Sequence, residues 1–346
     1  MIRVVHLLDD FAMGGVTRAL TLFENPAIAQ IARSEIIPSD PRARIAPVLN
    51  ADLVVDHMPF SWSRLAFLAS LRVRNPAARI VHVEHSYTRG FERHMVSAKG
   101  RFRRMIRMSA KLVDEVVCVS NAQRDWFINT VGLAHSKAIT IHPWTERPEL
   151  DAIEPPAPST GRPLHLLAYG RYAPVKNFES LVQAMRLFEP FQVRLTLFGG
   201  GPDHARLSGL ASEMPHVEVH GPSSNPASYL RDCDAVIMPS KYEAFGLVAT
   251  EARMAGRAII VADVDGLPEQ ARHGGIVMPM DDTQQIAAAI RLALQRDLAK
   301  LGKEARAGVS GQNDAIITAW KGIILRVALS KVSTNPVKTI TERTVA

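Results

Sequence analysis

Residues 233–263 read CDAVIMPSKYEAFGLVATEARMAGRAIIVAD, and this stretch is the most informative about the fold class. Two continuous apolar runs, at 233–240 and 257–263, flank a segment (245–255) in which apolar residues recur at spacings of three and four. Such runs predict buried strands, and the spacing between them predicts a helix. Because strands that are apolar on both faces belong to parallel sheets covered by helices, the stretch indicates an α/β fold.

The same alternation recurs along the chain, whose 346 residues exceed one typical domain. Proline-rich residues 146–163 separate two blocks of strands and are typical of a linker. We therefore predict two Rossmann-like domains, 1–145 and 164–310, whose parallel sheets face each other across a central cleft. A helix over 311–330 is placed to cross back to the first domain, and the polar tail 331–346 is expected to be disordered. The predicted strands are 2–8, 51–57, 79–85, 114–120 and 137–143, then 164–170, 191–199, 216–221, 233–240 and 257–263.

Composition favours a cytoplasmic protein. No apolar run of the sequence approaches the roughly 20 residues that a membrane-spanning helix needs. The N-terminal apolar run stops at Asp9 and Asp10, which favours a strand over a signal peptide. Cys118 and Cys233 fall in or beside predicted strands of different halves, as expected of reduced thiols in a core.

Positive charge is concentrated in one segment. Residues 1–145 hold 19 Lys and Arg against 12 Asp and Glu, and residues 89–111 alone hold eight against the single Glu92. Such a segment attracts the phosphates of lipids or nucleic acids. No aromatic-interleaved motif for reading bases accompanies the charge, so we expect no nucleic-acid partner.

Four loops that follow predicted strands of the second half carry candidate site residues. In open parallel sheets, ligands bind beyond the carboxyl ends of the strands, so these loops are expected to converge on one site. The loops are AYGRYAPVKN with Arg171 and Lys176, LFGGGPDHARL with Gly199, Gly200 and Gly201, YEAFGLVATEA with Glu243 and Glu251, and DVDGLPE with Glu269.

This ordered set of motifs resembles the donor domain of the family 4 glycosyltransferases, which have the two-Rossmann GT-B architecture. The resemblance covers roughly residues 160–275 well and the first half loosely. It implies a retaining enzyme that moves a sugar from a nucleotide-diphosphate sugar to a hydroxyl of a glycan or lipid-linked acceptor, as in the biosynthesis of cell-surface polysaccharides. It also implies catalysis with no metal ion and no other cofactor.

The resemblance assigns roles that physical chemistry supports. A departing diphosphate needs positive charge, which Arg171 and Lys176 would supply. The segment Ala244, Phe245, Gly246 and Leu247 would present the N-terminal N–H groups of the following helix to the same phosphates. Glu251 would bind the ribose hydroxyls and Glu243 the transferred sugar. Gly199, Gly200 and Gly201 would let the backbone approach the donor, and Glu269 would face the cleft.

The first half supplies fewer candidates. FAMGGVTRAL places Gly14 and Gly15 after the first strand, where the resemblance implies a donor or acceptor contact. His85 follows a strand, where the family often carries a histidine near the transferred sugar; a purely structural histidine is the alternative. This half is short and lacks a full strand–helix unit between residues 34 and 50. In ADVDG, Asp265 stands where the family has a glycine, and we do not interpret the two aspartates as a metal site.

A basic helix is predicted over residues 101–113. Arg101, Arg103, Arg104, Arg107 and Lys111 could hold it on anionic lipid beside an acceptor, peripherally at the inner face of the membrane. The alternative is a helix that buries its apolar face in its own domain while its arginines face solvent.

Other functions remain compatible with the motifs. The first is another enzyme of the same architecture, such as an epimerase or a glycosyl phosphorylase. The second is a catalytically inactive sugar-nucleotide-binding or scaffold protein. The third is a protein that binds anionic surfaces and in which the two Rossmann-like domains serve only as a scaffold.

Overall fold

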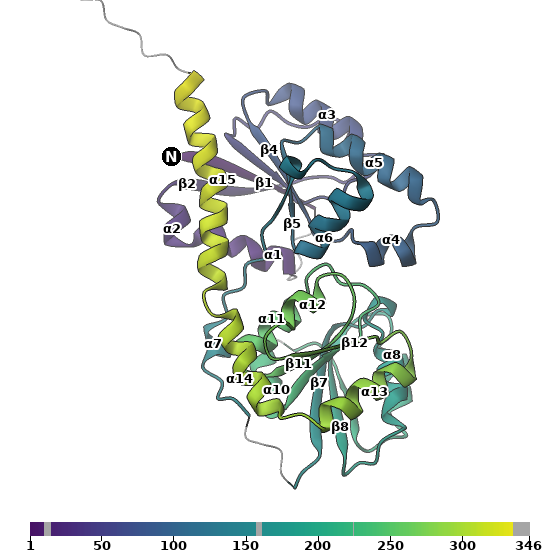
Figure 1. The fold of residues 1–346 in the computed structure, drawn as a ribbon. Helices are drawn as coiled ribbons and strands as arrows, with labels where there is room; N and C mark the ends of the chain where they lie inside the picture. The colour runs from purple at the N-terminus through teal and green to yellow at the C-terminus, as the bar shows by residue number, and fades with distance from the viewer. Residues whose placement is uncertain (10–14, 157–160, 224, 335–346) are drawn as a thin grey trace, which may run out of the picture.

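The computed structural model describes residues 1–9, 15–156, 161–223 and 225–334. Within them the chain forms two six-stranded parallel sheets, one in each half, with helices on both faces (Figure 1). This confirms the predicted α/β architecture of two Rossmann-like domains. No helix of the described residues is long and apolar enough to cross a membrane.

The first sheet has the order β2-β1-β3-β4-β5-β6, and the second has the order β12-β11-β10-β7-β8-β9. In the second sheet the strand order reverses between β7 and β10, the crevice at which such folds bind ligands. The strands are β1 Ile2–Leu8, β2 Ala32–Pro38, β3 Leu53–Asp56, β4 Arg79–Glu84, β5 Glu115–Cys118, β6 Ala138–Thr140, β7 Leu164–Arg171, β8 Val193–Gly200, β9 Val217–His220, β10 Ala235–Met238, β11 Ala258–Ala262 and β12 Gly275–Met278.

Helices and short turns connect the strands. In the first half they are α1 Gly15–Ala19, η1 Leu20–Glu24, α2 Pro26–Ala29, α3 Leu65–Arg74, α4 Arg89–Met95, α5 Lys99–Lys111, α6 Asn121–Trp126, η2 Phe127–Val131 and η3 His135–Lys137. They continue as α7 Pro148–Asp151, η4 Pro174–Lys176, α8 Phe178–Met185, α9 His204–Ala211, α10 Pro226–Asp232, α11 Leu247–Met254, α12 Leu267–Gln270, α13 Thr283–Leu294, α14 Leu298–Val309 and α15 Gln312–Thr334.

Two edge strands were missed by the sequence analysis. β2 begins just before the stretch for which no strand–helix unit was expected, and residues 39–52 after it form no helix. The expectation that no full strand–helix unit lies between residues 34 and 50 is therefore confirmed, although the end of β2 falls within that stretch. Both β2 and β12 lie at sheet edges and leave side chains exposed, so they lack the continuous apolar run of an inner strand.

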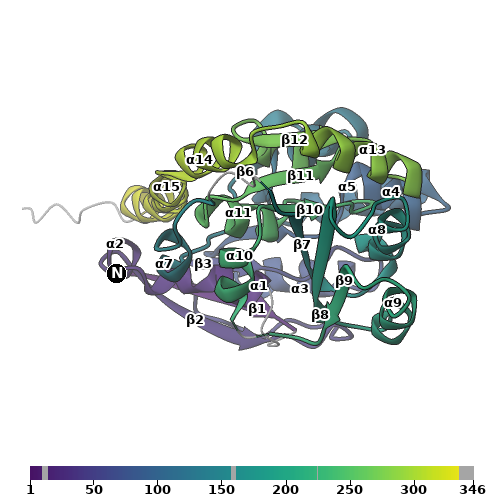
Figure 2. The same ribbon diagram turned by 90° about the horizontal axis from the view of Figure 1, so that it is seen from below.

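The last helix, α15, crosses from the second domain to the first and runs along it (Figures 1 and 2). Its Trp320 packs edge-on against Phe23, with 5.2 Å between ring centroids, and Arg326 forms an ion pair of 3.0 Å with Glu115. The helix continues to Thr334, so residues 331–334 are helical rather than part of a disordered tail; residues 335–346 lie outside the described part of the chain.

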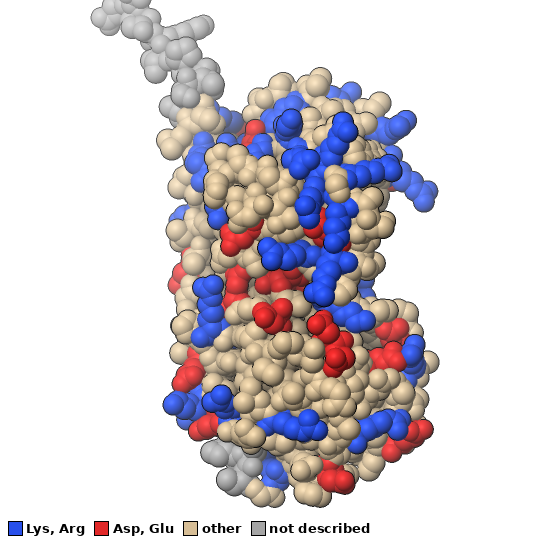
Figure 3. Space-filling view, turned by 45° about the vertical axis from the view of Figure 1, so that its right-hand side comes forward, with Lys and Arg blue, Asp and Glu red and all other residues tan. Residues whose placement is uncertain are grey.

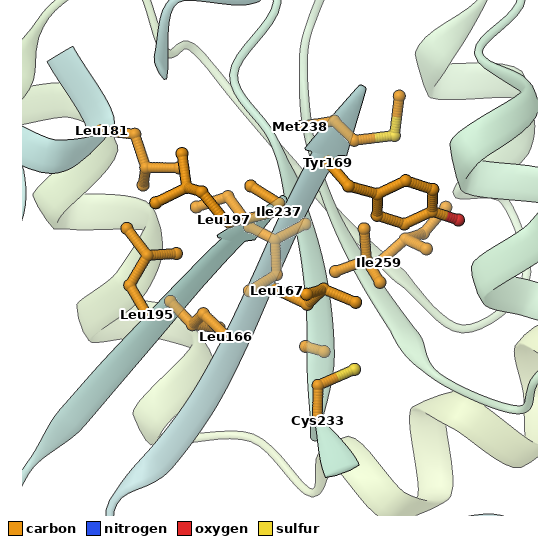
Figure 4. Packing of buried hydrophobic residues seen from close by; sticks show 14 of the residues in the cluster. Leu166, Leu167, Tyr169, Leu181, Leu195, Leu197, Cys233, Ile237, Met238 and Ile259 are labelled. Carbon is orange, nitrogen blue, oxygen red and sulfur yellow. The ribbon is translucent and has the colours of Figure 1, made fainter. Parts of the chain in front are cut away.

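The core of the second domain is built from the strands that the sequence predicts. Figure 4 shows Leu166, Leu195 and Leu197 packed together, whereas the hydroxyl end of Tyr169 points away from them. Leu150 of the proline-rich linker is also buried in this core, so part of the linker is packed structure. Both cysteines are free and buried.

Candidate active site

A cavity of about 390 Å³ lies where the first domain meets the carboxyl ends of β7 and β8. The first domain contributes Gly15 and Arg18 from α1. The second contributes Arg171 at the end of β7 and the N-terminal turns of α11. The loops that the sequence analysis singled out therefore converge in part on one site. Its wall also includes Tyr169, Gly170, Phe198, Gly199, Gly200, Pro222, Ser223, Pro226, Leu247, Val248 and Glu251.

The start of α11 depends on Gly246. This residue has φ of +88°, and a Cβ atom there would lie 2.7 Å from Leu267, so both the backbone and the packing require glycine. The helix then begins at Leu247, which with Val248 lines the cavity. The first N–H groups of a helix have no partner within the helix and carry partial positive charge. This end of α11 is thus suited to an anion in the cavity.

Glu251 is the one carboxylate among the described residues that line the cavity. Its side chain is buried and accepts hydrogen bonds from the hydroxyl of Tyr169 at 2.8 Å, Nη1 of Arg147 at 2.9 Å and Nη1 of Arg18 at 3.2 Å. Burial, and next the neighbouring carboxylate of Glu251, raise the pKa of Tyr169, so the phenol keeps its proton. Second domain, linker and first domain therefore meet at one carboxylate.

Lys176 and Glu243 form an ion pair in which both side chains are mostly buried. They lie outside the wall of the cavity that Arg171 and Glu251 share. Arg171 is exposed at that wall. The predicted pair of glutamates therefore divides between two environments, one bound to a lysine and the other to two arginines and a tyrosine.

The three consecutive glycines have different neighbours. Gly199 has φ of +156°, and a Cβ atom there would lie 1.9 Å from the carbonyl oxygen of Gly170, so no other residue fits. Gly199 and Gly200 line the cavity, as predicted for donor contact. Gly201 does not line it and instead packs against the backbone of Tyr172.

Glu269 does not line the donor cavity. Its carboxylate crosses to the N-terminus of α6 in the first domain, where it accepts from the backbone N–H of Asn121 at 3.0 Å and of Ala122 at 2.6 Å. The backbone nitrogens at the start of a helix are unsatisfied donors, so a carboxylate from the other domain fits there. In the structure Glu269 thus joins the two domains, and a contact with the donor stays a prediction.

Asp265 makes a second junction of the same kind. Its φ of +46° lies in the left-handed region, which explains why a glycine suits the position. The carboxylate accepts from Oγ1 of Thr88 at 2.7 Å and from the backbone N–H of Gly90 at 2.9 Å, both at the start of α4. Two carboxylates of one loop thus hold two helices of the first domain.

Ala244 and Phe245 also face the first domain. Both are buried in a cluster that contains strands β1 and β3 and helix α15, and the Phe245 ring lies 4.9 Å from that of His142. Their side chains form part of the domain contact and are not part of the cavity wall. Any donor contact by this pair would come from backbone.

His85 ends a chain of three histidines. Nδ1 of His57 lies 3.0 Å from Nε2 of His85, and Nε2 of His57 lies 3.0 Å from Nδ1 of His6. Burial lowers the pKa of His85 to about 4 and that of His6 to about 3, so the chain is neutral at pH 7. Gly15 lines the cavity, whereas Gly14 lies outside the described residues.

The basic helix α5 buries its apolar face in its own domain. Met105, Ile106 and Ala110 are buried there, which agrees with the structural alternative for this segment. Arg103 is held by Glu92 at 2.6 Å, and Arg107 donates to the carbonyl of Val131 at 2.9 Å.

The remaining cations of α5 face outward. Arg101 lies over the ring of Trp62, and Arg104 and Lys111 are exposed. Figure 3 shows that Lys and Arg gather on the first domain in that view. Within the described residues, no group of three or more His, Cys, Asp or Glu side chains is arranged to hold a metal ion.

Two family models match this chain. The model described as Glycosyltransferase Family 4 matches residues 22–146, and the model described as Glycosyl transferases group 1 matches residues 151–308. The chain belongs to glycosyltransferase family 4. The recognition made from the motifs is confirmed.

Relatives of this family 4 chain are similar over part of their length. A D-inositol 3-phosphate glycosyltransferase of Jonesia denitrificans is 34% identical over 36% of this chain and 33% of its own. An N-acetyl-alpha-D-glucosaminyl L-malate synthase of Bacillus anthracis is 30% identical over 46% of this chain and 44% of its own. A phosphatidyl-myo-inositol mannosyltransferase of Mycolicibacterium smegmatis is 29% identical over 55% and 51%. The matches thus span between a third and about half of these relatives.

Solved structures share the fold over nearly the whole family 4 chain. Anabaena HepE, in complex with UDP and glucose, has a TM-score of 0.70 at 16% identity and covers 97% of this chain and 100% of its own. Sucrose-phosphate synthase from Thermosynechococcus elongatus has a TM-score of 0.75 at 19% identity, with 95% and 100% covered. Both structures have the GT-B fold, which consists of two Rossmann-like domains.

Three site residues were missed by sequence reasoning: Arg18, Tyr169 and Arg147, which all bind Glu251. Arg18 and Tyr169 lie inside motifs that were examined, four residues after Gly14 and two before Arg171. Arg147 lies in the predicted linker. Its position after the last strand of the first domain was the available signal, since strand-exit segments of both domains face the cleft.

Glu269→Gln should lower the free energy of unfolding by about 2 kcal/mol at pH 7, the scale of hydrogen bonds to a charged group. Burial acts to raise the pKa of Glu269, but nearby His142 at 3.7 Å and the backbone hydrogen bonds from Ala122 and Asn121 lower it overall below its usual 4.5. Because its pKa is lower in the folded than in the unfolded protein, Glu269 stabilises the fold at pH values above its usual pKa. This contribution is lost as the pH falls through the folded-state pKa. Thermal unfolding of the two proteins at pH 7 and at pH 4 should show the difference shrinking in acid; a difference independent of pH would contradict this account.

Proposed function

We propose that this chain is a retaining glycosyltransferase that uses a nucleotide-diphosphate sugar. The observation that carries the proposal is the cavity between the domains, in which Arg171, the N-terminus of α11 and the buried Glu251 converge. Family membership and the UDP-glucose complex of the structural neighbour HepE support a nucleotide-sugar donor. Glu251 would accept from ribose hydroxyls, displacing part of its bonding to Arg18 and Arg147.

The reaction would proceed on one face of the sugar. The acceptor hydroxyl forms a bond to the anomeric carbon while the bond from that carbon to the diphosphate oxygen breaks, and its electron pair leaves with the diphosphate. That oxygen then takes the proton of the acceptor hydroxyl, so configuration is retained and no protein base is needed. Arg171, at the cavity wall, would stabilise the growing negative charge without a metal ion, and Lys176, paired with Glu243 outside that wall, would add positive charge from further away. Glu243, which holds Lys176, and the neutral His85 would position the transferred sugar.

The acceptor is proposed to be a glycan or lipid-linked hydroxyl at the inner face of the membrane. An apolar pocket of about 360 Å³ lies beside α4 and α5, lined by Trp62, Met95 and Phe102, with Arg101 at its wall. Exposed cations on α5 would each contribute about 1 kcal/mol near anionic lipid. This arrangement suits an acceptor with an anionic head and an apolar part, as expected in cell-surface polysaccharide biosynthesis.

Calorimetric titration with UDP, GDP and ADP in EDTA tests the donor site, and mass spectrometry of products with each matching nucleotide sugar tests transfer. Saturable binding of one nucleotide and transfer with retained configuration are expected. Product formed without any acceptor would indicate an epimerase. Binding without turnover across a broad acceptor panel would indicate an inactive binding or scaffold protein instead.

Charge reversal of Arg104 together with Lys111, both to glutamate, should weaken binding to anionic vesicles at least tenfold, because two cations near the surface become two anions. Both side chains are exposed, so folding should be unaffected. Flotation with phosphatidylglycerol vesicles measures the effect, with phosphatidylcholine vesicles as the blank. Equal flotation of both proteins would reject the membrane-bound acceptor surface while leaving the donor site untouched.

A further inference from the structure

A second cavity, of about 340 Å³, lies on the other side of α11. Arg253 lines it, whereas Glu251, two residues earlier on the same helix, lines the donor cavity. Two residues are about 200° apart around a helix, so the two cavities flank opposite faces of α11. The rest of the wall comes from His142 after β6, from Phe245 before α11, from the end of α12 and from the turn between α14 and α15. These last two parts contribute Glu269, Gln270, Arg272, His273, Gly308, Ser310, Gly311 and Gln312.

Arg253 is a buried cation for which the described residues provide no charged partner. Its side chain is 5% exposed, and Nη1 donates to Oε1 of Gln270 at 2.7 Å, but Nε has no hydrogen-bond partner within the described part of the chain. Burial lowers the pKa of Arg253 to about 10, and no nearby carboxylate offsets this. A buried charge without an opposite charge or full hydrogen bonding is costly, so the missing partner calls for an explanation.

A neighbouring arginine shows what a structural arginine looks like in this domain. Arg257 is 1% exposed, and it donates from Nε to the carbonyl of Leu230 at 2.6 Å and from Nη2 to that of Glu154 at 2.9 Å. Two of its nitrogens are thus bonded to backbone oxygens, and only Nη1 has no hydrogen-bond partner within the described residues. Arg253 has one neutral side-chain acceptor and otherwise faces the cavity.

The other residues of the wall are suited to binding an anion. Arg272 and His273 are exposed at the rim. Gly311 and Gln312 bring the start of α15, a helix of 23 residues whose first N–H groups lack helical acceptors. Among the described wall residues Glu269 is the one acidic side chain, and its oxygens already accept from Asn121 and Ala122.

We propose that this cavity binds a small phosphate-bearing anion between Arg253, Arg272 and the first turn of α15. A guanidinium presents paired donors that match phosphate oxygens, and charge-assisted bonds of this kind are short and strong. The anion would join the two domains and the crossover helix at their junction. The site is separate from the donor cavity and does not depend on the proposed transferase activity.

Titration of the full chain with sodium phosphate, against sodium chloride of equal ionic strength, tests the site. Because the donor cavity also suits phosphate, the titration is done in the Arg171→Gln variant. One saturable phosphate is expected to remain there. Adding Arg253→Met should weaken its affinity at least tenfold, and adding Arg272→Gln at least threefold. Adding Arg206→Gln, an exposed arginine on α9 outside the cavity, should leave it unchanged.

Equal affinity with and without Arg253→Met, or no saturable binding in the Arg171→Gln background, would overturn the proposal. If circular dichroism shows that Arg253→Met does not fold, the phosphate affinities of Arg272→Gln and His273→Gln test the proposal instead, since both side chains are exposed. Unchanged affinity in both would overturn it. Glycerol 3-phosphate distinguishes the source: tighter binding than inorganic phosphate identifies a phosphate monoester, and equal binding identifies free phosphate. A selenate peak between Arg253 and Arg272 in crystals of the full chain would locate the anion directly.

Discussion

Glu251→Ala should reduce the turnover of glycosyl transfer at least tenfold and weaken binding of the matching nucleotide. The carboxylate is buried and fixed by Tyr169, Arg147 and Arg18, so it is preorganised to accept hydroxyls of a bound ribose. Removing a preorganised charged contact of this kind costs about one to three orders of magnitude in rate. Its loss also leaves Arg147 without its buried partner, which adds to the effect. Steady-state kinetics with titration of the nucleotide measures both quantities.

Glu251→Gln is the matched control because it keeps the shape and one acceptor oxygen, while it removes the charge and replaces the second acceptor oxygen with an NH2 donor. It should retain more nucleotide affinity than the alanine variant, since its amide oxygen can still accept. Near-normal turnover of Glu251→Ala in a folded protein would refute the assignment of this cavity as the donor site.

Arg171→Ala should also lower turnover at least tenfold, with a smaller effect on binding of the free nucleotide. The side chain is exposed at the cavity wall, near the N-terminal turn of α11, where charge on a departing diphosphate would develop. Removing an interaction that strengthens in the transition state lowers kcat more than it raises KM. Turnover should be the same with EDTA, because Arg171 and Lys176 are proposed to replace a metal.

Arg186→Ala serves as the control, since Arg186 is an exposed arginine paired with Glu213 away from the cavity. Arg171→Lys should recover only part of the activity, because an ammonium lacks the planar pair of donors. An unchanged kcat in Arg171→Ala, or activity that requires an added divalent metal, would contradict the proposed charge stabilisation.

The sequence predicted the inner strands of both sheets and the edge strands β6 and β9, but missed the edge strands β2 and β12. Inner strands such as Ala258–Ala262 are buried along their whole length and therefore carry a continuous apolar run. β2 has only Ala32 fully buried, so its sequence shows no such run. Periodicity reports burial, and an edge strand is held mainly by backbone hydrogen bonds, which leave little trace in residue identity.

The places of the donor loops in the fold could be predicted because they follow from local rules, whereas their contact with a donor stays a prediction. Arg171, Gly199 and Leu247 follow strands that must end at the same edge of a parallel sheet, and the structure places all three at one cavity. Glu269 follows the same rule, yet it faces the first domain. A residue in a loop that follows a strand can contact either a ligand in the interdomain cleft or the opposite domain. Its position in the sequence alone therefore does not predict which of the two it contacts.

By itself, then, the sequence determined the architecture, the family and the strand ends at which the site lies, because hydrophobic periodicity and motif order are local properties. Only the tertiary structure decided the partners of Glu251, which come from 233 residues away at Arg18 and 104 residues away at Arg147. It also decided that Asp265 and Glu269 join the domains and that the described residues provide no charged partner for Arg253. Such pairings depend on how separately folded domains dock, and no local pattern encodes that geometry.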